Sequence, residues 1–232
     1  MIKAFLFDID NTLYDYDAAH RAAFGAVSDY ACRTYGLTPD GFADLHRRGN
    51  RILQERVGSV TAAIHNRLIR YQIMLEELGR PVGGAPRMAG IYWSTFLDAM
   101  EPGAGLAPCI AALKERGFRL GVGTNMTAEY QFAKLERLGV LEAMDFIVSS
   151  EEAGVEKPER RLFDLCAQKA GCAPGQCVFV GDSLELDARG ALAAGMVPVW
   201  LCPEERTCES PIRRIASLSE LPALAESLKS KQ

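Results

Sequence analysis

The chain has 232 residues, of which 48% are hydrophobic and 24% charged, and its formal net charge is −4 at pH 7. This composition is ordinary for a globular protein and suits one domain or two. The acidic balance argues against nucleic acid or an anionic membrane as a partner, because such binders carry a clustered excess of Lys and Arg. No apolar stretch reaches the length of a membrane span, and the N-terminus lacks a signal-peptide pattern.

Cysteine and histidine usage indicates a cytoplasmic protein without a zinc site. The seven cysteines form no CxxC pair, which fits reduced thiols. The three histidines, His20, His46 and His65, show no ligand spacing, and we expect them at the surface. A basic cluster in the same third of the chain is expected to be a solvated helix face. It comprises His46, Arg47, Arg48, Arg51, Arg56, Arg67 and Arg70.

The first predicted element is a buried strand over residues 2–7, which form an apolar run. Residues 16–101 follow and contain no convincing strand. Apolar spacing predicts helices over residues 17–35, from Pro39 onward, over residues 61–78, and from residue 86 or 87 to 100, with Thr38 as the cap of the second. We therefore predict an all-helical cap domain, residues 16–101, inserted after the first strand.

From about residue 106 onward, helix and strand patterns alternate. Helices are expected over residues 107–116, 127–138, 159–170, 184–194 and 218–228. Strands are expected over residues 118–123, 145–149, 177–180, 196–201 and 214–216. This rhythm predicts an α/β fold, a doubly wound parallel sheet that forms a core domain from residues 1–15 and 102–232.

Four polar segments lie at or just after the ends of predicted strands. They are Asp8-Ile9-Asp10-Asn11-Thr12, Thr124-Asn125, Lys157-Pro158, and Gly181-Asp182-Ser183 with Asp187 beyond it. Ligands of doubly wound sheets lie beyond the carboxyl ends of the strands, so we expect the segments to form one site. Carboxylates at a buried strand end are costly unless something pairs with them, and carboxylate-rich ligation favours Mg²⁺.

Each of these residue types suits one role in phosphate transfer. Asp8 is the predicted nucleophile, which would form an aspartyl-phosphate, and Asp10 the general acid and base. Thr124 would bind a phosphoryl oxygen, and Lys157 would neutralise negative charge. Turn and capping roles account for Asp8 and Asp10 taken alone, so the prediction depends on all four segments together.

Metal and substrate contacts are assigned in the same way. The predicted Mg²⁺ ligands are Asp8, Asp182 and a carbonyl oxygen from Asp10. Asp187 and Ser183 are expected in supporting positions, where Asp187 would accept from a bound water or orient Lys157. We assign substrate binding to Asn125, Tyr14 and Arg51.

The segments DIDNTL, TN, KP and GDSLELD resemble, in order, the four motifs of the haloacid dehalogenase-like hydrolase superfamily. The resemblance covers essentially the whole chain. It implies a Rossmann-like core, a helical cap of the C1 type inserted after the first motif, and Mg²⁺-dependent phosphoryl transfer. The family roles fall on Asp8, Asp10, Thr124, Lys157, Asp182 and Asp187.

Two details refine this expectation. Haloacid dehalogenases of the family have no acidic residue at the position of Asp10 and need no metal, so Asp10 favours phosphatase chemistry. The segment 150–158 and, more weakly, the stretch 50–61 resemble the pyrimidine 5′-nucleotidase branch. The expected substrate is a small phosphorylated metabolite, with a nucleoside monophosphate as one candidate, and the protein is expected to be a monomer or homodimer.

Two other functions stay open at this point. The first is a sugar phosphomutase, because the mutases of the family also carry the second aspartate. The second is a non-catalytic phosphate-binding regulatory module, which is disfavoured because no catalytic position is missing.

Overall fold

A computed structural model describes residues 1–229 of the chain. Two compact units are present. The first, here called the core unit, consists of Met1–Asp15 and Glu101–Gln232, and the second, the helical unit, is Tyr16–Met100. The chain leaves and re-joins the core unit at neighbouring points, because Tyr14 forms a β-bridge to Pro102.

The core unit contains one six-stranded sheet in the order β3-β2-β1-β4-β5-β6, and every neighbouring pair is parallel. This confirms the predicted doubly wound parallel sheet. All four residues of β1 are buried, as an apolar strand requires when helices cover both faces of a sheet. The strands are β1 Ala4–Phe7, β2 Arg119–Thr124, β3 Phe146–Ser149, β4 Cys177–Gly181, β5 Val197–Leu201 and β6 Arg213–Ile215.

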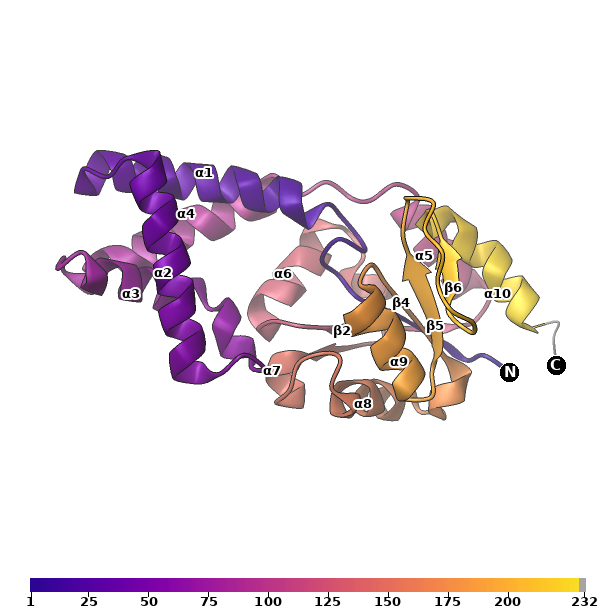
Figure 1. Cartoon of the computed structure of the whole chain (residues 1–232). Helices are drawn as coiled ribbons and strands as arrows, with labels where there is room; N and C mark the ends of the chain where they lie inside the picture. Colours follow the sequence, from indigo (N-terminus) through magenta and orange to yellow (C-terminus); the bar gives the residue numbers. More distant parts are fainter. Residues whose placement is uncertain (230–232) are drawn as a thin grey trace. The chain divides into compact units, whose positions relative to one another are not determined.

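Helices flank both faces of this sheet (Figure 1). From β1 the chain moves toward one edge of the sheet, to β2 and then β3, and helices α5 and α6 precede these two strands. From β3 it crosses back to β4 and β5 on the other side of β1, by way of α8 and α9. Because such crossovers are right-handed, the two pairs of helices lie on opposite faces of the sheet. Helix α10 packs against α5. The bounds are α5 Leu106–Glu115, α6 Ala128–Arg137, α7 Ser150–Ala153, α8 Arg160–Ala170, α9 Gly190–Ala193 and α10 Leu221–Lys229.

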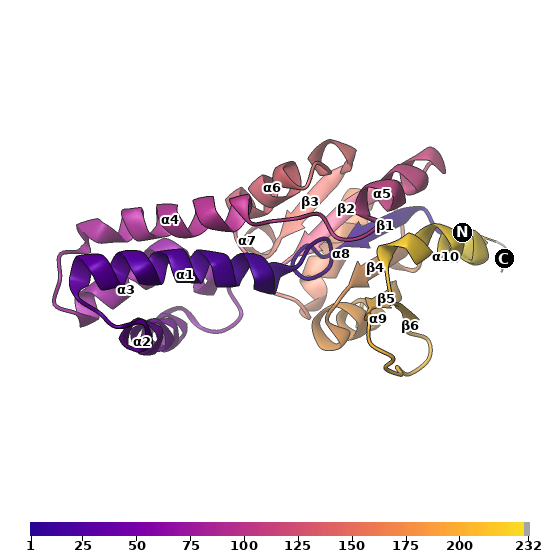
Figure 2. The same ribbon diagram turned by 90° about the horizontal axis from the view of Figure 1, so that it is seen from above.

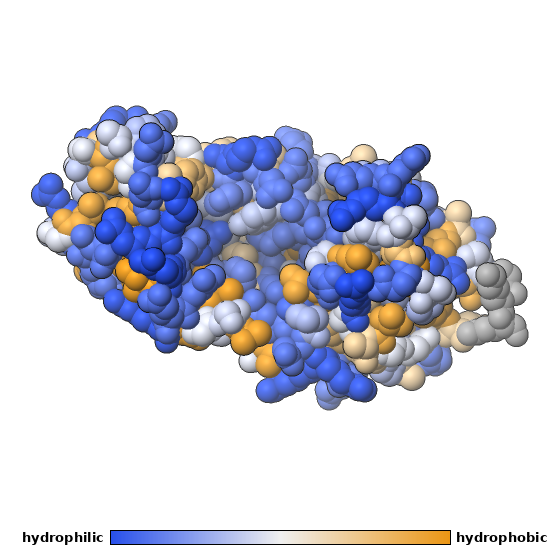
Figure 3. Space-filling model, in the orientation of Figure 1, coloured by the Kyte–Doolittle hydropathy of each residue, from blue (hydrophilic) through white to orange (hydrophobic). Residues whose placement is uncertain are grey.

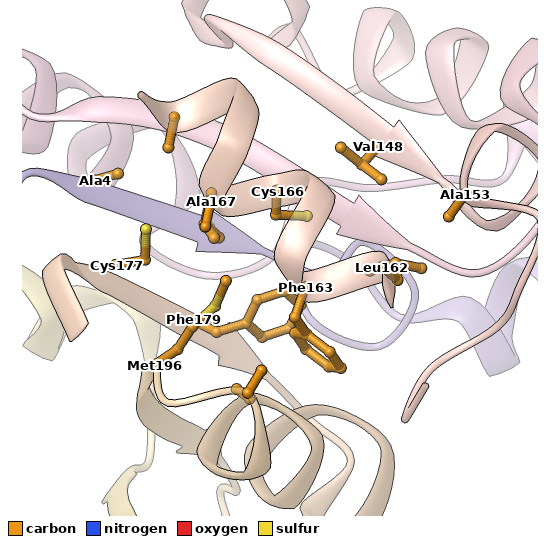
Figure 4. Close-up of a cluster of buried hydrophobic side chains, with 14 residues drawn as sticks. Ala4, Val148, Ala153, Leu162, Phe163, Cys166, Ala167, Cys177, Phe179 and Met196 are labelled. Carbon is orange, nitrogen blue, oxygen red and sulfur yellow. The ribbon is translucent and has the colours of Figure 1, made fainter. Parts of the chain in front are cut away.

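A cluster of buried apolar side chains joins α8 and α9 to the sheet (Figure 4). Phe163 of α8 meets Phe179 of β4 edge-on, with ring centroids 5.0 Å apart. A Cβ atom at Gly123 would lie 2.8 Å from the Phe179 ring and 2.9 Å from the Cys166 sulfur. Helix α8 therefore packs closely on β2 because position 123 has no side chain.

The helical unit has four helices, α1 Tyr16–Tyr35, α2 Pro39–Val57, α3 Arg67–Glu77 and α4 Ala85–Asp98, with 3₁₀ turns at Ala62–His65 and Val82–Gly84. Helices α1 and α4 run side by side (Figure 2). Thr38 caps α2, as expected, by accepting from the Gly41 N–H at 3.1 Å. The single helix expected over residues 61–78 is wrong, because Asn66 is extended and its side chain caps a new helix by accepting from Ile69 N–H.

Three smaller expectations also need correction. The helix expected over residues 184–194 begins as a π-helical turn, Leu184–Arg189, and becomes α-helical only in α9. The helix expected over residues 218–228 begins with a 3₁₀ turn, Leu218–Glu220. The helix expected over residues 127–138 begins at Ala128, because Thr127 is extended and makes no side-chain capping bond; the Glu151 carboxylate accepts from the Ala128 N–H instead, at 2.8 Å.

Part of the basic cluster expected on a solvated helix face is buried instead. Arg67 and Arg70 of α3 are each only 6% exposed, whereas Arg51 of α2 is exposed. His46, also expected at the surface, is 8% exposed. Arg67 lies under tyrosines from two other helices, so the packing of the helices against one another buries it.

The face seen in Figure 3 is mostly hydrophilic, with apolar side chains in small separate groups. Among residues 1–229, no helix combines the length and apolarity that crossing a membrane requires. All seven cysteines are free thiols.

Candidate active site

The carboxyl ends of three neighbouring strands bring the predicted site residues together. Asp8 directly follows β1, Thr124 is the last residue of β2, and Asp182 directly follows β4. Strand β1 pairs with β2 on one side and β4 on the other. Parallel strands end at a common edge, so residues far apart in the sequence meet there.

Lys157 connects two of the carboxylates. Its Nζ donates to Asp8 Oδ1 at 2.6 Å and to Asp187 Oδ1 at 2.7 Å, and its side chain is 3% exposed. The Asn125 side-chain oxygen accepts from the Lys157 backbone N–H at 2.8 Å. Asn125, expected to bind substrate, thus also holds the backbone that carries the lysine, and the peptide bond to Pro158 is cis.

Asp8, Asp182 and Asp187 form an acidic group whose candidate ligand atoms all lie within 4.8 Å of one another. Thr12 fixes Asp182 twice: its hydroxyl accepts from the Asp182 N–H at 3.1 Å and donates to the carboxylate at 3.3 Å. On the other side, Trp200 Nε1 donates to the Asp182 carbonyl at 2.8 Å. Backbone and side chain of Asp182 are therefore both held in place.

Asp187 lies against a position that only glycine fits. A Cβ atom at Gly181 would stand 2.3 Å from the Asp187 carboxyl carbon. The Ser183 N–H donates to Asp187 Oδ2 at 3.0 Å, and the Ser183 hydroxyl accepts from the Leu186 N–H at 3.1 Å. The glycine of the GDS segment thus leaves room for Asp187 to reach Lys157, and Ser183 supports the turn.

Burial shifts the protonation of the acidic group. It raises the pKa of Asp8 to about 7, with the charge of Lys157 acting in the opposite direction. Burial and the Asp187 carboxylate raise the pKa of Asp182 to about 6. Burial also disfavours charge on Lys157, but the carboxylates of Asp187 and Asp8 outweigh it and raise the pKa of Lys157.

These carboxylates fit a hard divalent cation. Three acidic side chains lie close together and two of them are ion-paired with a single ammonium group, so the group has an excess of negative charge at neutral pH. Oxygen donors at this spacing are the ligands that Mg²⁺ prefers, and a cation would lower the raised pKa values of Asp8 and Asp182. The observed convergence of Asp8 and Asp182 is the geometry that a shared ion needs.

Two residues of the core unit, Lys134 and Tyr14, hold the carboxylate of Asp10, and Lys134 was not predicted from the sequence. Lys134 of α6 donates from Nζ to both carboxylate oxygens of Asp10, at 2.7 and 2.9 Å, and its side chain is 0% exposed. The Tyr14 hydroxyl also donates to Asp10 Oδ1. Tyr14 was expected to bind substrate, but it is only 3% exposed and so offers almost no accessible surface for that contact.

A second missed residue, Gln131, lies one turn before Lys134 on α6. Its Nε2 donates to the Thr124 hydroxyl at 2.7 Å and to the Asn125 carbonyl at 2.8 Å. Gln131 and Lys134 are both fully buried on a helix that packs on the sheet. Polar residues three apart on the inner face of that helix are the signal that would have found them, because such positions are normally apolar.

The remaining predicted residue, Arg51, belongs to α2 of the helical unit. Its side chain is 69% exposed and lies 3.8 Å from Glu55. Such a surface pair contributes little to stability, which leaves Arg51 available to solvent.

Comparisons with known proteins agree with this geometry. A model of the haloacid dehalogenase-like hydrolase family matches residues 2–195. A ribulose-1,5-bisphosphate 5-phosphatase from Halopiger xanaduensis is 35% identical over 210 residues, which is 89% of this chain and 87% of that protein. A pyrimidine 5′-nucleotidase from Escherichia coli is 25% identical over 94% of this chain and 95% of its own length.

Among solved structures, a 2-haloacid dehalogenase from Pseudomonas syringae is 26% identical, with a TM-score of 0.81 over 98% of this chain and 100% of that one. The structural likeness extends over both units, and the curated relatives carry phosphatase names. The chain therefore belongs to the haloacid dehalogenase-like hydrolase family, as an enzyme of its phosphatase type.

Proposed function

We propose that the protein is a Mg²⁺-dependent phosphatase that hydrolyses a small phosphomonoester through an aspartyl-phosphate on Asp8. The observation that carries this proposal is the contact of Lys157 with both Asp8 and Asp187, beside Asp182. One Asp8 oxygen is engaged by Lys157, and among residues 1–229 no other side-chain hydrogen bond reaches the Asp8 carboxylate. A second oxygen is thereby left for attack on phosphorus.

In the first step, an Asp8 oxygen attacks phosphorus and the bond to the substrate oxygen breaks. Asp10 gives that oxygen a proton as general acid, and in the second step it takes a proton from the water that hydrolyses the aspartyl-phosphate. Lys157 and the Thr124 hydroxyl stabilise negative charge on the phosphoryl oxygens. Free phosphate and the alcohol are the products, and Asp8 returns to its starting state.

The proposed ion ligands are Asp8, Asp182 and the Asp10 carbonyl oxygen, with Asp187 close enough to hold a coordinated water. When bound, Mg²⁺ neutralises charge on the carboxylates and on the transferring phosphoryl group. Lys157 then has a positioning role as well, because it fixes the orientation of Asp8 with respect to Asp187.

The helical unit is proposed to act as the cap that selects the substrate. Curated relatives at 35% identity act, by their names, on ribulose 1,5-bisphosphate in Halopiger xanaduensis and on glyceraldehyde 3-phosphate in Methanopyrus kandleri. Sugar phosphates of this size are therefore favoured over the nucleoside monophosphate that the weaker nucleotidase likeness suggests. Seven free thiols support the cytoplasm as its compartment.

The test is phosphate release from a panel of sugar phosphates, nucleotides and p-nitrophenyl phosphate, with Mg²⁺ and with EDTA. We expect turnover only with the metal, and a loss of about 10³-fold or more in Asp8→Asn, because the nucleophile is removed. Asp164→Asn, an exposed change on α8, is the matched control. Equal turnover by Asp8→Asn would refute the assignment, and sugar phosphate isomerisation without free phosphate would show a phosphomutase instead.

A further inference from the structure

Gln131 places an amide on the inner face of α6, where an apolar side chain is normally found. It is 0% exposed, like Leu135 one turn later on the same helix. The buried face of a helix is usually apolar, because burying an amide costs free energy unless hydrogen bonds replace its contacts with water. The hydrogen bonds that Gln131 makes therefore indicate its role.

The Gln131 side chain donates two hydrogen bonds to the end of β2, where Thr124 is proposed to contact the phosphoryl group. Its Nε2 donates to the Thr124 hydroxyl at 2.7 Å and to the Asn125 carbonyl at 2.8 Å. The Asn125 side chain in turn accepts from the Lys157 backbone N–H. All of these residues belong to the core unit, so α6 and the strand end that carries Thr124 are directly connected.

The Asn125 carbonyl fixes the orientation of the Gln131 amide. A carbonyl oxygen can only accept, so the Gln131 atom beside it must be the nitrogen. The Thr124 hydroxyl lies 2.7 Å from that same nitrogen, which can only donate, so the hydroxyl oxygen accepts. The hydroxyl proton of Thr124 must therefore point away from Gln131.

That proton has only a weak acceptor within the protein. Among residues 1–229, the one other partner of the Thr124 hydroxyl is the Asn125 carbonyl, at 3.3 Å. This distance is longer than the length of about 2.8 Å that O–H···O bonds prefer, and the carbonyl already accepts from Gln131. The hydroxyl is thus available to donate to an arriving acceptor, and an ionised phosphoryl oxygen is an acceptor that cannot donate.

The other end of the Gln131 amide makes a purely structural role less favourable. In the described part of the chain, its Oε1 is buried and has no hydrogen-bond partner. A buried acceptor without a donor costs free energy, and a methionine or leucine at this position would avoid that cost. The contacts of the nitrogen, rather than packing, account for a glutamine here.

We propose that Gln131 is a positioning residue, which orients the Thr124 hydroxyl as a hydrogen-bond donor toward the transferring phosphoryl group. This inference rests on the proposed function, in which that hydroxyl stabilises negative charge on a phosphoryl oxygen. A donor that is already oriented needs no reorganisation when charge develops in the transition state. Without Gln131, the hydroxyl turns toward the Asn125 carbonyl, which has then lost its bond from the amide.

The first experiment measures p-nitrophenyl phosphate hydrolysis with Mg²⁺ by the full-length protein. Gln131→Met keeps a similar volume and removes the amide. We expect kcat to fall about 10-fold, less than the loss of about 10²-fold or more for a whole oxyanion donor, because the hydroxyl remains. KM should stay within about 3-fold, since an oriented donor acts mainly in the transition state. Gln168→Met, the same change at an exposed position of α8, should alter neither constant.

A double-mutant cycle tests whether Gln131 acts through Thr124. Thr124→Val removes the hydroxyl, so adding Gln131→Met to it should lower kcat by no more than about 2-fold. Losses that multiply would overturn the inference. Thermal unfolding checks each variant, and if Gln131→Met does not unfold cooperatively, Gln131→Asn replaces it. That variant keeps an amide but is one methylene too short to reach the hydroxyl, so the same losses are expected.

Binding of orthovanadate with Mg²⁺, measured by calorimetry, tests the same contact without turnover. Bound vanadate adopts the five-coordinate geometry of phosphoryl transfer, so its affinity should fall about 10-fold in Gln131→Met, in parallel with kcat. Vanadate binding that depends on Gln131, in a protein that releases no phosphate from any substrate, would refute the proposed function alone. If kcat and vanadate affinity are both unchanged in Gln131→Met, the positioning role is wrong.

Discussion

Two neighbouring side chains hold the carboxylate of Asp10, the proposed general acid and base. Lys134 reaches both of its oxygens, and Tyr14 reaches one. A side chain held from two directions has few orientations, and proton transfer depends on orientation. We therefore expect Lys134 to be a positioning residue, whose effect on the rate passes through Asp10.

Replacing Lys134 by Met keeps the volume of the side chain and removes the ion pair. We expect kcat for p-nitrophenyl phosphate to fall about 10- to 100-fold, within the range that general acid–base catalysis contributes. If Lys134 acts through Asp10, adding Lys134→Met to Asp10→Asn should cause no further loss. A steady-state double-mutant cycle measures this, and fully additive losses would contradict the positioning role.

At the scale of elements, α2 buries the imidazole of His46 inside the helical unit, near the basic side chains of Arg67 and Arg70 on α3. His46 of α2 is buried against the Phe24 and Phe42 rings and stays neutral in the folded state. An unfolded chain has no such burial, so its imidazole binds a proton near pH 6.5. The unfolded state consequently binds more protons between pH 6.5 and about 3, and stability is lost as the pH falls through that window.

This predicts acid lability that depends on His46. By pH 5 the wild type should lose about 2 kcal/mol of unfolding free energy that His46→Gln keeps, since one pH unit corresponds to about 1.4 kcal/mol. Urea unfolding followed by circular dichroism at pH 7, 6 and 5 gives the two slopes. The test compares only how the free energy of unfolding changes with pH, so a difference in stability between the two proteins at pH 7 does not affect it. Equal slopes would show that His46 is protonated in the folded protein.

For the whole molecule, the core unit holds every residue proposed for phosphate chemistry. Its two chain segments meet beside the point where the helical unit is inserted, because Tyr14 bridges to Pro102 and the Gly103 N–H donates to the Leu13 carbonyl at 2.7 Å. A short linker can therefore replace Tyr16–Met100 without stretching the core.

We expect the protein with residues 16–100 replaced by a Gly-Ser linker to unfold cooperatively and to keep its stabilisation by Mg²⁺. At a metal concentration of 100 times Kd, that stabilisation is about 2.7 kcal/mol. Thermal unfolding with Mg²⁺ and with EDTA measures it, and Asp182→Asn in the shortened chain should abolish the shift. Loss of cooperative unfolding would mean that the core depends on the helical unit.

The sequence alone identified the parallel sheet, the helical character of residues 16–101 and the polar segments at the strand ends. Local rules were enough for this, because apolar runs mark buried strands and polar residues at strand ends are costly without a function. The capping of α2 by Thr38 is equally local. Asn66, which divides an expected helix, was missed because a capping residue inside a helical pattern looks like any other polar residue.

Only the tertiary structure decided which polar side chains are buried together. Arg67 and Arg51 look alike in the sequence, yet one lies under tyrosines from two other helices and the other in solvent. Lys134 and Asp10 are 124 positions apart, and their contact arises because α6 packs on the sheet, where it contacts β3. Helical periodicity predicts on which face of a helix a residue lies, but the residues that this face contacts depend on how the elements pack in space.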